Sequence, residues 1–217
     1  MRNRAKMALG KAGVTAALLL ALMAFAPQAE AIVANGGTID YIGTGTVTIT
    51  FLTSDAAFRS YLVLFKPSDL STVLTPAGTP CAGCPTGAFF NSDVTPPGTT
   101  FVLTEAFLQA NFPLGAREMV FGILVDENID GVIDRTYYMG AAARNPDTFI
   151  HADVQPGLPQ EAIVGFEDIF GGGDQDYNDH VFSFFPVIVQ TPNPGGLLLV
   201  GLGLIGLAAA DWRRRRR

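Results

Sequence analysis

Apolar and β-branched residues alternate with polar residues through the middle of the chain. The pattern begins in 38–65, where the runs 46–52 and 61–65 have the length and composition of strands. Further runs of this kind cover 101–103, 119–125, 136–139, 162–166 and 181–185. The nearly continuous apolar run at 119–125 is typical of a strand buried on both faces. No long amphipathic helix interrupts the series, so the pattern predicts an all-β, antiparallel, jelly-roll-like β-sandwich of roughly eight strands.

Two segments break this pattern. Residues 104–112 are compatible with one short helix, which Pro113 would end. Residues 66–100 are rich in proline and glycine and predict a long irregular excursion. The excursion holds both cysteines, Cys81 and Cys84, and in an exported chain a C-x-x-C pair most simply forms a disulfide across a loop. A thioredoxin-like redox site would need a following helix, and a zinc site would need a second pair.

Phenylalanine is heavily used, with sixteen copies, most of them inside the predicted strands. Large aromatic side chains of this kind fill the space between two sheets. An exposed aromatic platform for stacking sugars is the other interpretation.

The N-terminus has the order of a secretion signal. Four basic residues precede an apolar run at 14–26, and the small-x-small sequence Ala29-Glu30-Ala31 follows it. This order predicts a signal peptide at 1–31 with cleavage after Ala31, and a buried helix is the other interpretation. The exported β-sandwich domain then covers 32–190.

The C-terminal segment 191–217 carries a Pro192-Asn193-Pro194 motif, an uncharged run at 195–210 and five arginines at 213–217. The run is slightly short for a bilayer span, and the arginines would keep that end on the cytoplasmic side. The tail resembles PEP-CTERM sorting signals, although its motif lacks the glutamate. This resemblance implies transient anchoring in the inner membrane and removal by an exosortase-type transpeptidase.

Between residues 32 and 194, eighteen acidic side chains face only five basic ones. Such a domain repels phosphate backbones, which argues against nucleic acid as a partner. Twelve of the acids lie between residues 126 and 179. Because this crowding is self-repelling, it indicates bound counter-ions.

The segment 126–134 follows the buried run directly. Oxygen-bearing side chains occupy its relative positions 1, 3, 5 and 9, with glycine at position 6, as in the first part of a calcium loop: Asp126, Asn128, Asp130, Asp134 and Gly131. The spacing is similar to the short aspartate-rich loops of dockerins and thrombospondin-type repeats. An acidic hairpin turn without an ion is the other interpretation.

A second acidic segment lies at 165–179. Its candidate ligands are Asp174, Asp176 and Asn178 at alternate positions, Asp179 one residue out of phase, and Glu167 and Asp168 at the end of the preceding strand. Hard oxygen ligands suit calcium, magnesium or manganese, and calcium is the cofactor that we expect. The other interpretation is that these acids accept backbone N–H bonds and cap the turn.

The second acidic segment carries a family resemblance. The sequence Gly165-Phe166-Glu167-Asp168, followed by Gly172-Gly173-Asp174-x-Asp176-Tyr177-Asn178-Asp179 and an apolar strand, resembles the C-terminal signature of the bacterial extracellular module called domain of unknown function 4114. Asn145-Pro146-Asp147 with His151 resembles its middle segment, and the likeness covers 41–185. Such modules occur in adhesin-like surface proteins and in small exported proteins with sorting tails. The resemblance implies a β-rich extracellular module with calcium dependence and no settled activity.

The sequence contains little evidence of a catalytic site. His151 and His180 are the only imidazoles, and His180 shares the parity of core residues, which favours a structural role. Glu167 and Asp168 are adjacent, so in a strand they would point to opposite faces rather than flank one glycosidic bond. No G-x-S-x-G nucleophile motif occurs. We therefore expect no enzymatic activity.

Three functional hypotheses follow. The first is a non-enzymatic, calcium-stabilised protein of the cell surface, cell envelope or extracellular matrix. The second is a carbohydrate-binding or adhesion module of an exopolysaccharide or biofilm matrix, with Tyr137, Tyr138 and Tyr177 as the sugar contacts. The third, a metal-assisted hydrolase, would need an open coordination position on the ion and a base beside it.

Overall fold

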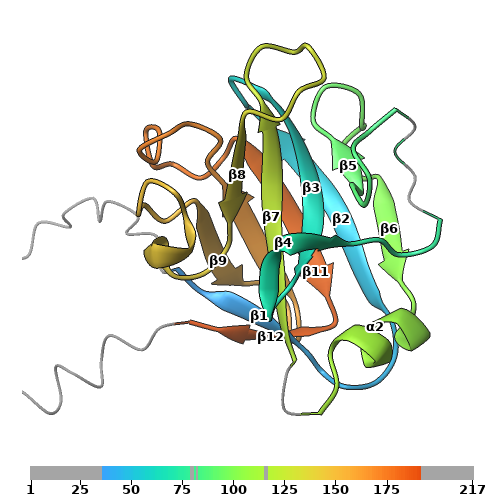
Figure 1. Ribbon diagram of the computed structural model, residues 1–217. Coiled ribbons are helices and arrows are strands. Elements are labelled where there is room, and N and C mark those ends of the chain that lie inside the picture. Colours follow the sequence, from blue (N-terminus) through green and yellow to red (C-terminus); the bar gives the residue numbers. More distant parts are fainter. Residues whose placement is uncertain (1–35, 79–80, 82, 115–116, 192–217) are drawn as a thin grey trace, which may run out of the picture. The chain divides into compact units, whose positions relative to one another are not determined.

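The computed structural model describes residues 36–78, 81, 83–114 and 117–191 (Figure 1). The chain separates into two compact units, 1–33 and 34–217, and every described residue belongs to the second. The predicted signal peptide and the apolar run and arginines of the predicted sorting tail lie outside the described residues. No helix within the described part is long and apolar enough to span a membrane.

Two antiparallel sheets form the domain. The first has the order β12-β1-β7-β3-β4, with β5 added beside β3 and β8 beside β7. Its strands are β1 (Thr38–Tyr41), β3 (Arg59–Lys66), β4 (Asp69–Leu74), β5 (Phe90–Asn91), β7 (Glu118–Asp126), β8 (Arg135–Tyr138) and β12 (Val187–Gln190). The second has the order β6-β2-β11-β10-β9. Its strands are β2 (Val47–Ser54), β6 (Thr100–Leu103), β9 (Ala152–Pro156), β10 (Ala162–Phe166) and β11 (His180–Phe185).

Aromatic side chains join the two sheets. Phe121 on β7 packs against Phe184 on β11 with ring centroids 4.5 Å apart, and Phe90 on β5 packs against Phe182 on β11 at 5.6 Å. These rings are buried, as are most of the phenylalanines within the predicted strands. Burial of this apolar area drives the sheets together. The predicted antiparallel β-sandwich is confirmed.

All seven predicted strand runs occur as strands, within one or two residues at each end. Residues Met119–Asp126 of β7 are all buried, as the apolar run predicted. The short helix is also present, as α2 (Glu105–Asn111), and the Thr104 hydroxyl caps it by accepting the Phe107 N–H at 3.3 Å.

The excursion predicted at 66–100 was partly wrong. Its two short apolar fragments form β4 and β5, both of which add to β3. Phe89 and Phe90 enter the core, because their burial outweighs the turn preference of the prolines and glycines around them. Cys81 and Cys84 are joined by a disulfide in the remaining loop.

The connections at one end of the sandwich carry the acidic segments. β10 and β11 are neighbours in register, with Phe166 opposite His180, and the loop 167–179 joins them. The β7–β8 loop leaves the first sheet at Asp126, and the connection from β8 to β9 contains the 3-10 helix η1 (Ala142–Arg144). Figure 1 shows the 167–179 loop, in orange, beyond the ends of β10 and β11.

Candidate metal site

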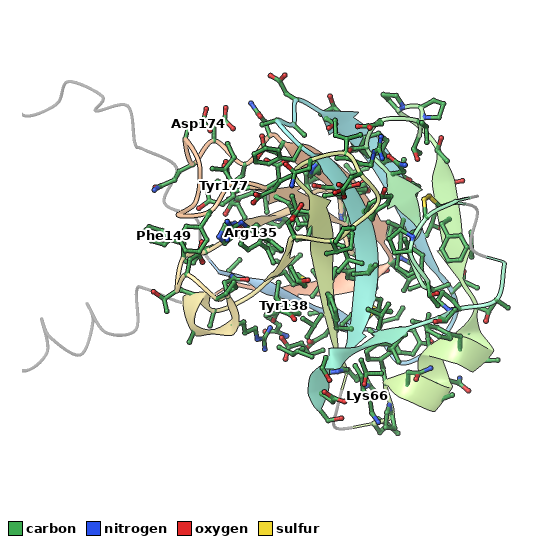
Figure 2. All side chains as sticks on the ribbon, turned by 45° about the horizontal axis from the view of Figure 1, so that its top comes forward. Lys66, Arg135, Tyr138, Phe149, Asp174 and Tyr177 are labelled. Carbon is green, nitrogen blue, oxygen red and sulfur yellow. A yellow bond between two sulfur atoms is a disulfide. The ribbon has the colours of Figure 1, made fainter. Side chains whose placement is uncertain are left out.

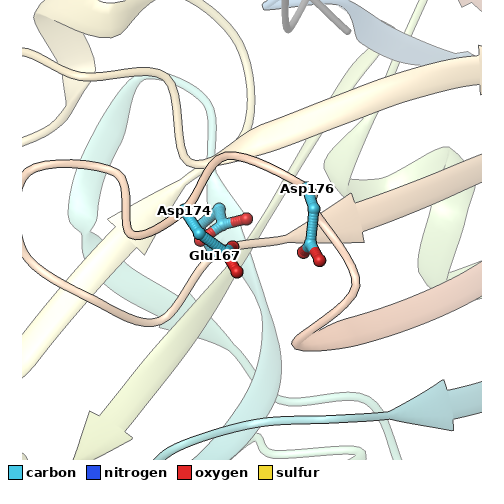
Figure 3. Close-up of side chains that lie close together, drawn as sticks. All are labelled: Glu167, Asp174 and Asp176. Carbon is cyan, nitrogen blue, oxygen red and sulfur yellow. The ribbon is translucent and has the colours of Figure 1, made fainter. Parts of the chain in front are cut away.

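Three acidic side chains converge in the β10–β11 loop. Oxygens of Glu167, Asp174 and Asp176 all lie within 4.8 Å of one another (Figure 3). Glu167 comes directly after β10 and is only 1% exposed, whereas the two aspartates are exposed. The cluster therefore has one carboxylate anchored in the protein and two that face solvent.

Only one of the two carboxylate oxygens of Glu167 has a hydrogen-bond partner. Its Oε1 accepts the Tyr177 N–H at 2.6 Å, but its buried Oε2 has no hydrogen-bond partner. Burial raises the pKa of Glu167, and the negative charges of Asp174, Asp176 and Asp168 raise it further, against the lowering effect of the Tyr177 bond. A bound cation would compensate a buried, unpartnered carboxylate oxygen of this kind.

The backbone of the loop is shaped to bring the aspartates over Glu167. Gly173 has a positive φ of 51°, and a Cβ added there would lie 2.2 Å from Glu167 Oε2. Only glycine leaves room for that oxygen. Gln175 and Tyr177 also have positive φ values, 63° and 55°, which turn the chain twice between Asp174 and Asp179.

A buried ion pair ties this loop to the segment before β9. Asp147 Oδ2 accepts the Gly171 N–H at 2.8 Å and lies 2.8 Å from His151 Nε2, and both paired side chains are at most 1% exposed. His151 Nδ1 lies 2.9 Å from the Glu167 carbonyl oxygen, which can only accept. Both ring nitrogens thus face acceptors, as in a ring protonated on both.

The surroundings keep Asp147 ionised. Burial alone would raise the pKa of Asp147, but hydrogen bonds from the Gly171 N–H, His151 and the Phe149 N–H together lower it below its usual value. The Tyr137 ring stacks on His151, with centroids 3.6 Å apart and planes 7° apart. The pair therefore fixes the Glu167 carbonyl group and Gly171, two points of the loop that leads from Glu167 to Asp174.

Asp168 and Asp179 form a separate buried pair. Asp179 Oδ2 accepts the Asp168 N–H at 2.8 Å, and Asp168 Oδ2 accepts the Phe58 N–H at 3.1 Å and lies 3.5 Å from His180 Nε2. Burial, with the nearby charges of Asp168 and Glu167, raises the pKa of Asp179 to about 7. These buried carboxylates thus hold the two ends of the 167–179 loop together and attach them to the β2–β3 connection at Phe58.

The raised pKa of Asp179 predicts a pH dependence of stability. Because its folded pKa of about 7 exceeds the unfolded value of about 3.9, its contribution is complete below pH 4 and is lost as pH rises through 7. Without calcium, the melting temperature should fall by several degrees between pH 5 and pH 8. Asp179→Asn should flatten this slope in thermal melts with chelator, and an unchanged slope would contradict the assignment.

The β7–β8 loop uses its acids differently. Asp126 accepts the Asp130 and Gly131 N–H groups at 3.0 Å each, and Asp134 accepts the Glu127 N–H at 2.8 Å. Asp130 accepts the Val132 N–H at 2.9 Å. Every residue of 126–134 is described, and these carboxylates form no close group of three. Their contacts match the acidic-turn interpretation.

Asn178 contacts a candidate ligand instead of joining the cluster. Its side chain donates to Asp176 Oδ2 at 2.6 Å, so it orients that carboxylate.

Arg135 connects the two acidic loops. Its guanidinium donates to Glu127 and lies 4.7 Å from the centre of the Phe170 ring. A cation–π contact thus links the two loops, and the ion pair with Glu127 holds Arg135 within the β7–β8 hairpin.

The tyrosines predicted as sugar contacts are mostly unsuited to that role. Tyr137 and Tyr177 are buried, the first against His151 and the second with its hydroxyl donating to the Ile150 carbonyl at 3.2 Å. Tyr138 packs on Phe65, with ring centroids 4.7 Å apart. Two phenylalanines are exposed instead: Phe170, which belongs to the loop, and Phe149, which Figure 2 labels.

Comparison with known proteins supports the family resemblance. Residues 116–185 match the family described as Domain of unknown function (DUF4114). This confirms the resemblance for the segment that carries the cluster, and leaves the sorting tail untested. No curated protein matches the chain.

A similar solved structure is the Chromobacterium violaceum lectin CV2L in complex with alpha-methyl-fucoside. The likeness has a TM-score of 0.33 and 18% sequence identity, and it covers 69% of this chain and 94% of the lectin chain. At this TM-score it carries no argument about the ligand of the present chain.

Proposed function

We propose that this chain, with its DUF4114 segment, is an exported, non-enzymatic surface or matrix protein whose β-sandwich is stabilised by calcium. Glu167, Asp174 and Asp176 are the proposed ligands. The observation that carries the proposal is the buried Glu167 Oε2, which has no hydrogen-bond partner although its carboxylate belongs to the cluster with the two exposed aspartates. Leaving such a group unpaired is costly, and a hard cation relieves the cost.

Turn capping alone does not account for this cluster. In the β7–β8 loop, carboxylates accept backbone N–H groups, and capping explains their placement. Glu167 Oε2 instead lies where a Cβ on Gly173 would touch it, and no N–H reaches it. Since calcium takes six to eight oxygen ligands, three carboxylates would leave positions for backbone carbonyls, water or an external ligand.

The two ends of the sequence supply the proposed location. The signal-like segment 1–31 would direct export, and the apolar tail would hold the protein in the inner membrane until an exosortase-type transpeptidase removes it. The mature domain would then act at the cell envelope or outside the cell.

Calcium should raise the melting temperature of the purified protein. A ligand that binds only the folded state contributes about 2.7 kcal/mol at a hundredfold excess over Kd, which corresponds to a shift of roughly 5–10 °C for a domain of this size. Glu167→Gln should remove most of the shift, because it removes the anchoring charge. Differential scanning calorimetry with chelator or millimolar calcium measures both.

The matched control is Asp130→Asn, which neutralises an acid of the other loop. It should leave the calcium shift intact, since Asp130 caps a turn by accepting the Val132 N–H. Identical melting curves of the unmodified protein in chelator and calcium would refute the proposal. Loss of the shift in the control, with retention in Glu167→Gln, would move the ion to the β7–β8 loop.

A further inference from the structure

Two half-exposed phenylalanines flank the proposed calcium site. Phe170 is 54% exposed and Phe149 is 45% exposed. Phe170 lies within the turn that the Gly172 N–H closes onto the Ile169 carbonyl at 3.1 Å, and the Phe149 ring packs on Gly172 of the same turn. We call Phe149, Phe170 and the Arg135 guanidinium the aromatic surface; Figure 2 labels Phe149 and Arg135 in the same region as Asp174.

Contacts hold both rings in place. The Phe170 ring lies against Arg135, whose guanidinium is also held by Glu127. The Phe149 ring packs on Gly172, where an added Cβ would lie 3.3 Å from the ring, and its N–H donates to Asp147 Oδ1 at 3.1 Å. Fixed, solvent-facing aromatic rings lose little entropy when a ligand packs on them.

The ion site and the aromatic surface share one loop, since Phe170 belongs to 167–179 and the Phe149 ring packs on Gly172. Asp174 and Asp176 are exposed, whereas the inner ligand Glu167 is buried. Coordination positions that the protein leaves free would therefore be on the exposed side, next to the aromatic surface. A ligand with adjacent oxygen atoms and an apolar face would suit both.

The excess of acidic side chains in the domain argues against a negatively charged ligand. Eighteen acidic and five basic residues between 32 and 194 would repel polyanions, including nucleic acids and anionic membranes. A neutral sugar avoids this repulsion, because its hydroxyl oxygens can bind calcium and its C–H face can pack on an aromatic ring.

A groove continues from Arg135 along the outer side of β8. Its volume is about 590 Å³, and its polar lining includes Asp134, Arg135, Thr136, Tyr138, Arg144 and Asn145. Of these, the exposed Asp134 and the half-exposed Arg135 and Thr136 offer both donors and acceptors, which sugar hydroxyls need. The groove extends the binding surface beyond a single sugar unit.

From these observations we infer that the calcium site and the aromatic surface bind a neutral polysaccharide. Hydroxyl oxygens complete the coordination of the ion, sugar rings pack on Phe170 and Phe149, and further units follow the groove beside Arg135. This inference rests on the proposed calcium site and adds the class of ligand to it.

Retention of the full-length protein on immobilised mannan, dextran and alginate tests the inference. We expect retention on mannan or dextran in millimolar calcium and its loss in chelator. Phe170→Ala and Phe149→Ala should each weaken retention about tenfold, because each removes one stacking surface. Phe185→Ala is the matched control: Phe185 is 48% exposed but lies at the other end of β11 from the loop.

Each result decides the question. Absence of calcium-dependent retention on mannan and dextran, retention on alginate alone, or full retention by both loop variants would overturn the inference. Calorimetry on the same samples separates the two proposals: a calcium shift without retention rejects only the polysaccharide, whereas absence of the shift rejects both. A normal calcium shift in Phe170→Ala and Phe149→Ala shows that each remains folded.

Discussion

Asp147→Ala is expected to destabilise the protein by about 3–5 kcal/mol, because it breaks a buried ion pair and leaves its partner unpaired. The Asp147 carboxylate contacts His151 Nε2 and the Gly171 N–H, each at 2.8 Å, and its side chain is 1% exposed. Removal leaves a buried imidazole and a backbone N–H without their acceptor. Since Gly171 lies in the turn between Glu167 and Asp174, the calcium shift in melting temperature should also shrink.

Asp93→Ala is the matched control for this variant. Asp93 also accepts from a basic side chain, Arg59, at 2.7 Å, but its side chain is 36% exposed. An ion pair at the surface contributes about 0–1 kcal/mol. Urea unfolding monitored by circular dichroism compares the two variants, and equal midpoints would show that the Asp147–His151 pair does not stabilise the fold.

The sheets could be predicted from the sequence because their signal is local. The run at 119–125 identifies β7 without knowledge of its neighbours, and the pattern at 181–185 identifies β11. β9 reads Ala-Asp-Val-Gln-Pro, and its alternation is too short and too polar to stand out. It becomes a strand because β10 supplies a partner along all five residues. Pairing with β10, and not the strand propensity of its own residues, therefore makes this segment a strand.

The candidate site shows the limit of spacing arguments. The 126–134 loop has the better match to a linear calcium pattern, yet its carboxylates accept backbone N–H groups of the loop itself. The cluster that does form combines Asp174 and Asp176 with Glu167, which comes from the end of a strand seven residues earlier. Which acids converge depends on the path of the backbone through Gly173 and Gln175, both of which have positive φ.

The supporting contacts depend even more on tertiary structure. His151 and Asp147 were part of the family resemblance, but nothing in their spacing indicates that they hold Gly171. Tyr137 and Tyr177 lie beside acidic loops in sequence, which suggested exposure. Strand parity instead turns Tyr137 inward onto His151. Conversely, Phe149 and Phe170 belong to short loop fragments and remain exposed.

Gly165→Ala is expected to destabilise the protein by about 3 kcal/mol, because the new methyl group would overlap the backbone. A Cβ at Gly165 in β10 would lie 2.0 Å from the Tyr177 carbonyl oxygen. Relief requires the loop to lift from β10, and this movement would also draw the Tyr177 N–H away from Glu167 Oε1. The variant should therefore lose stability and calcium response together, in calorimetry with and without calcium.

Gly157→Ala separates this effect from the general cost of replacing a glycine. Its Cβ would also meet an oxygen closely, at 2.6 Å, but that oxygen is Glu161 Oε2, at the end of a flexible side chain. Rotation of the glutamate relieves the contact but weakens its hydrogen bonds from the Leu158 N–H and the Ser183 hydroxyl, so the expected cost is about 1 kcal/mol. If both variants melt alike, close contact between β10 and the Tyr177 carbonyl does not hold the loop. If Gly165→Ala alone loses stability and keeps its full calcium shift, the cluster does not depend on the position of Tyr177.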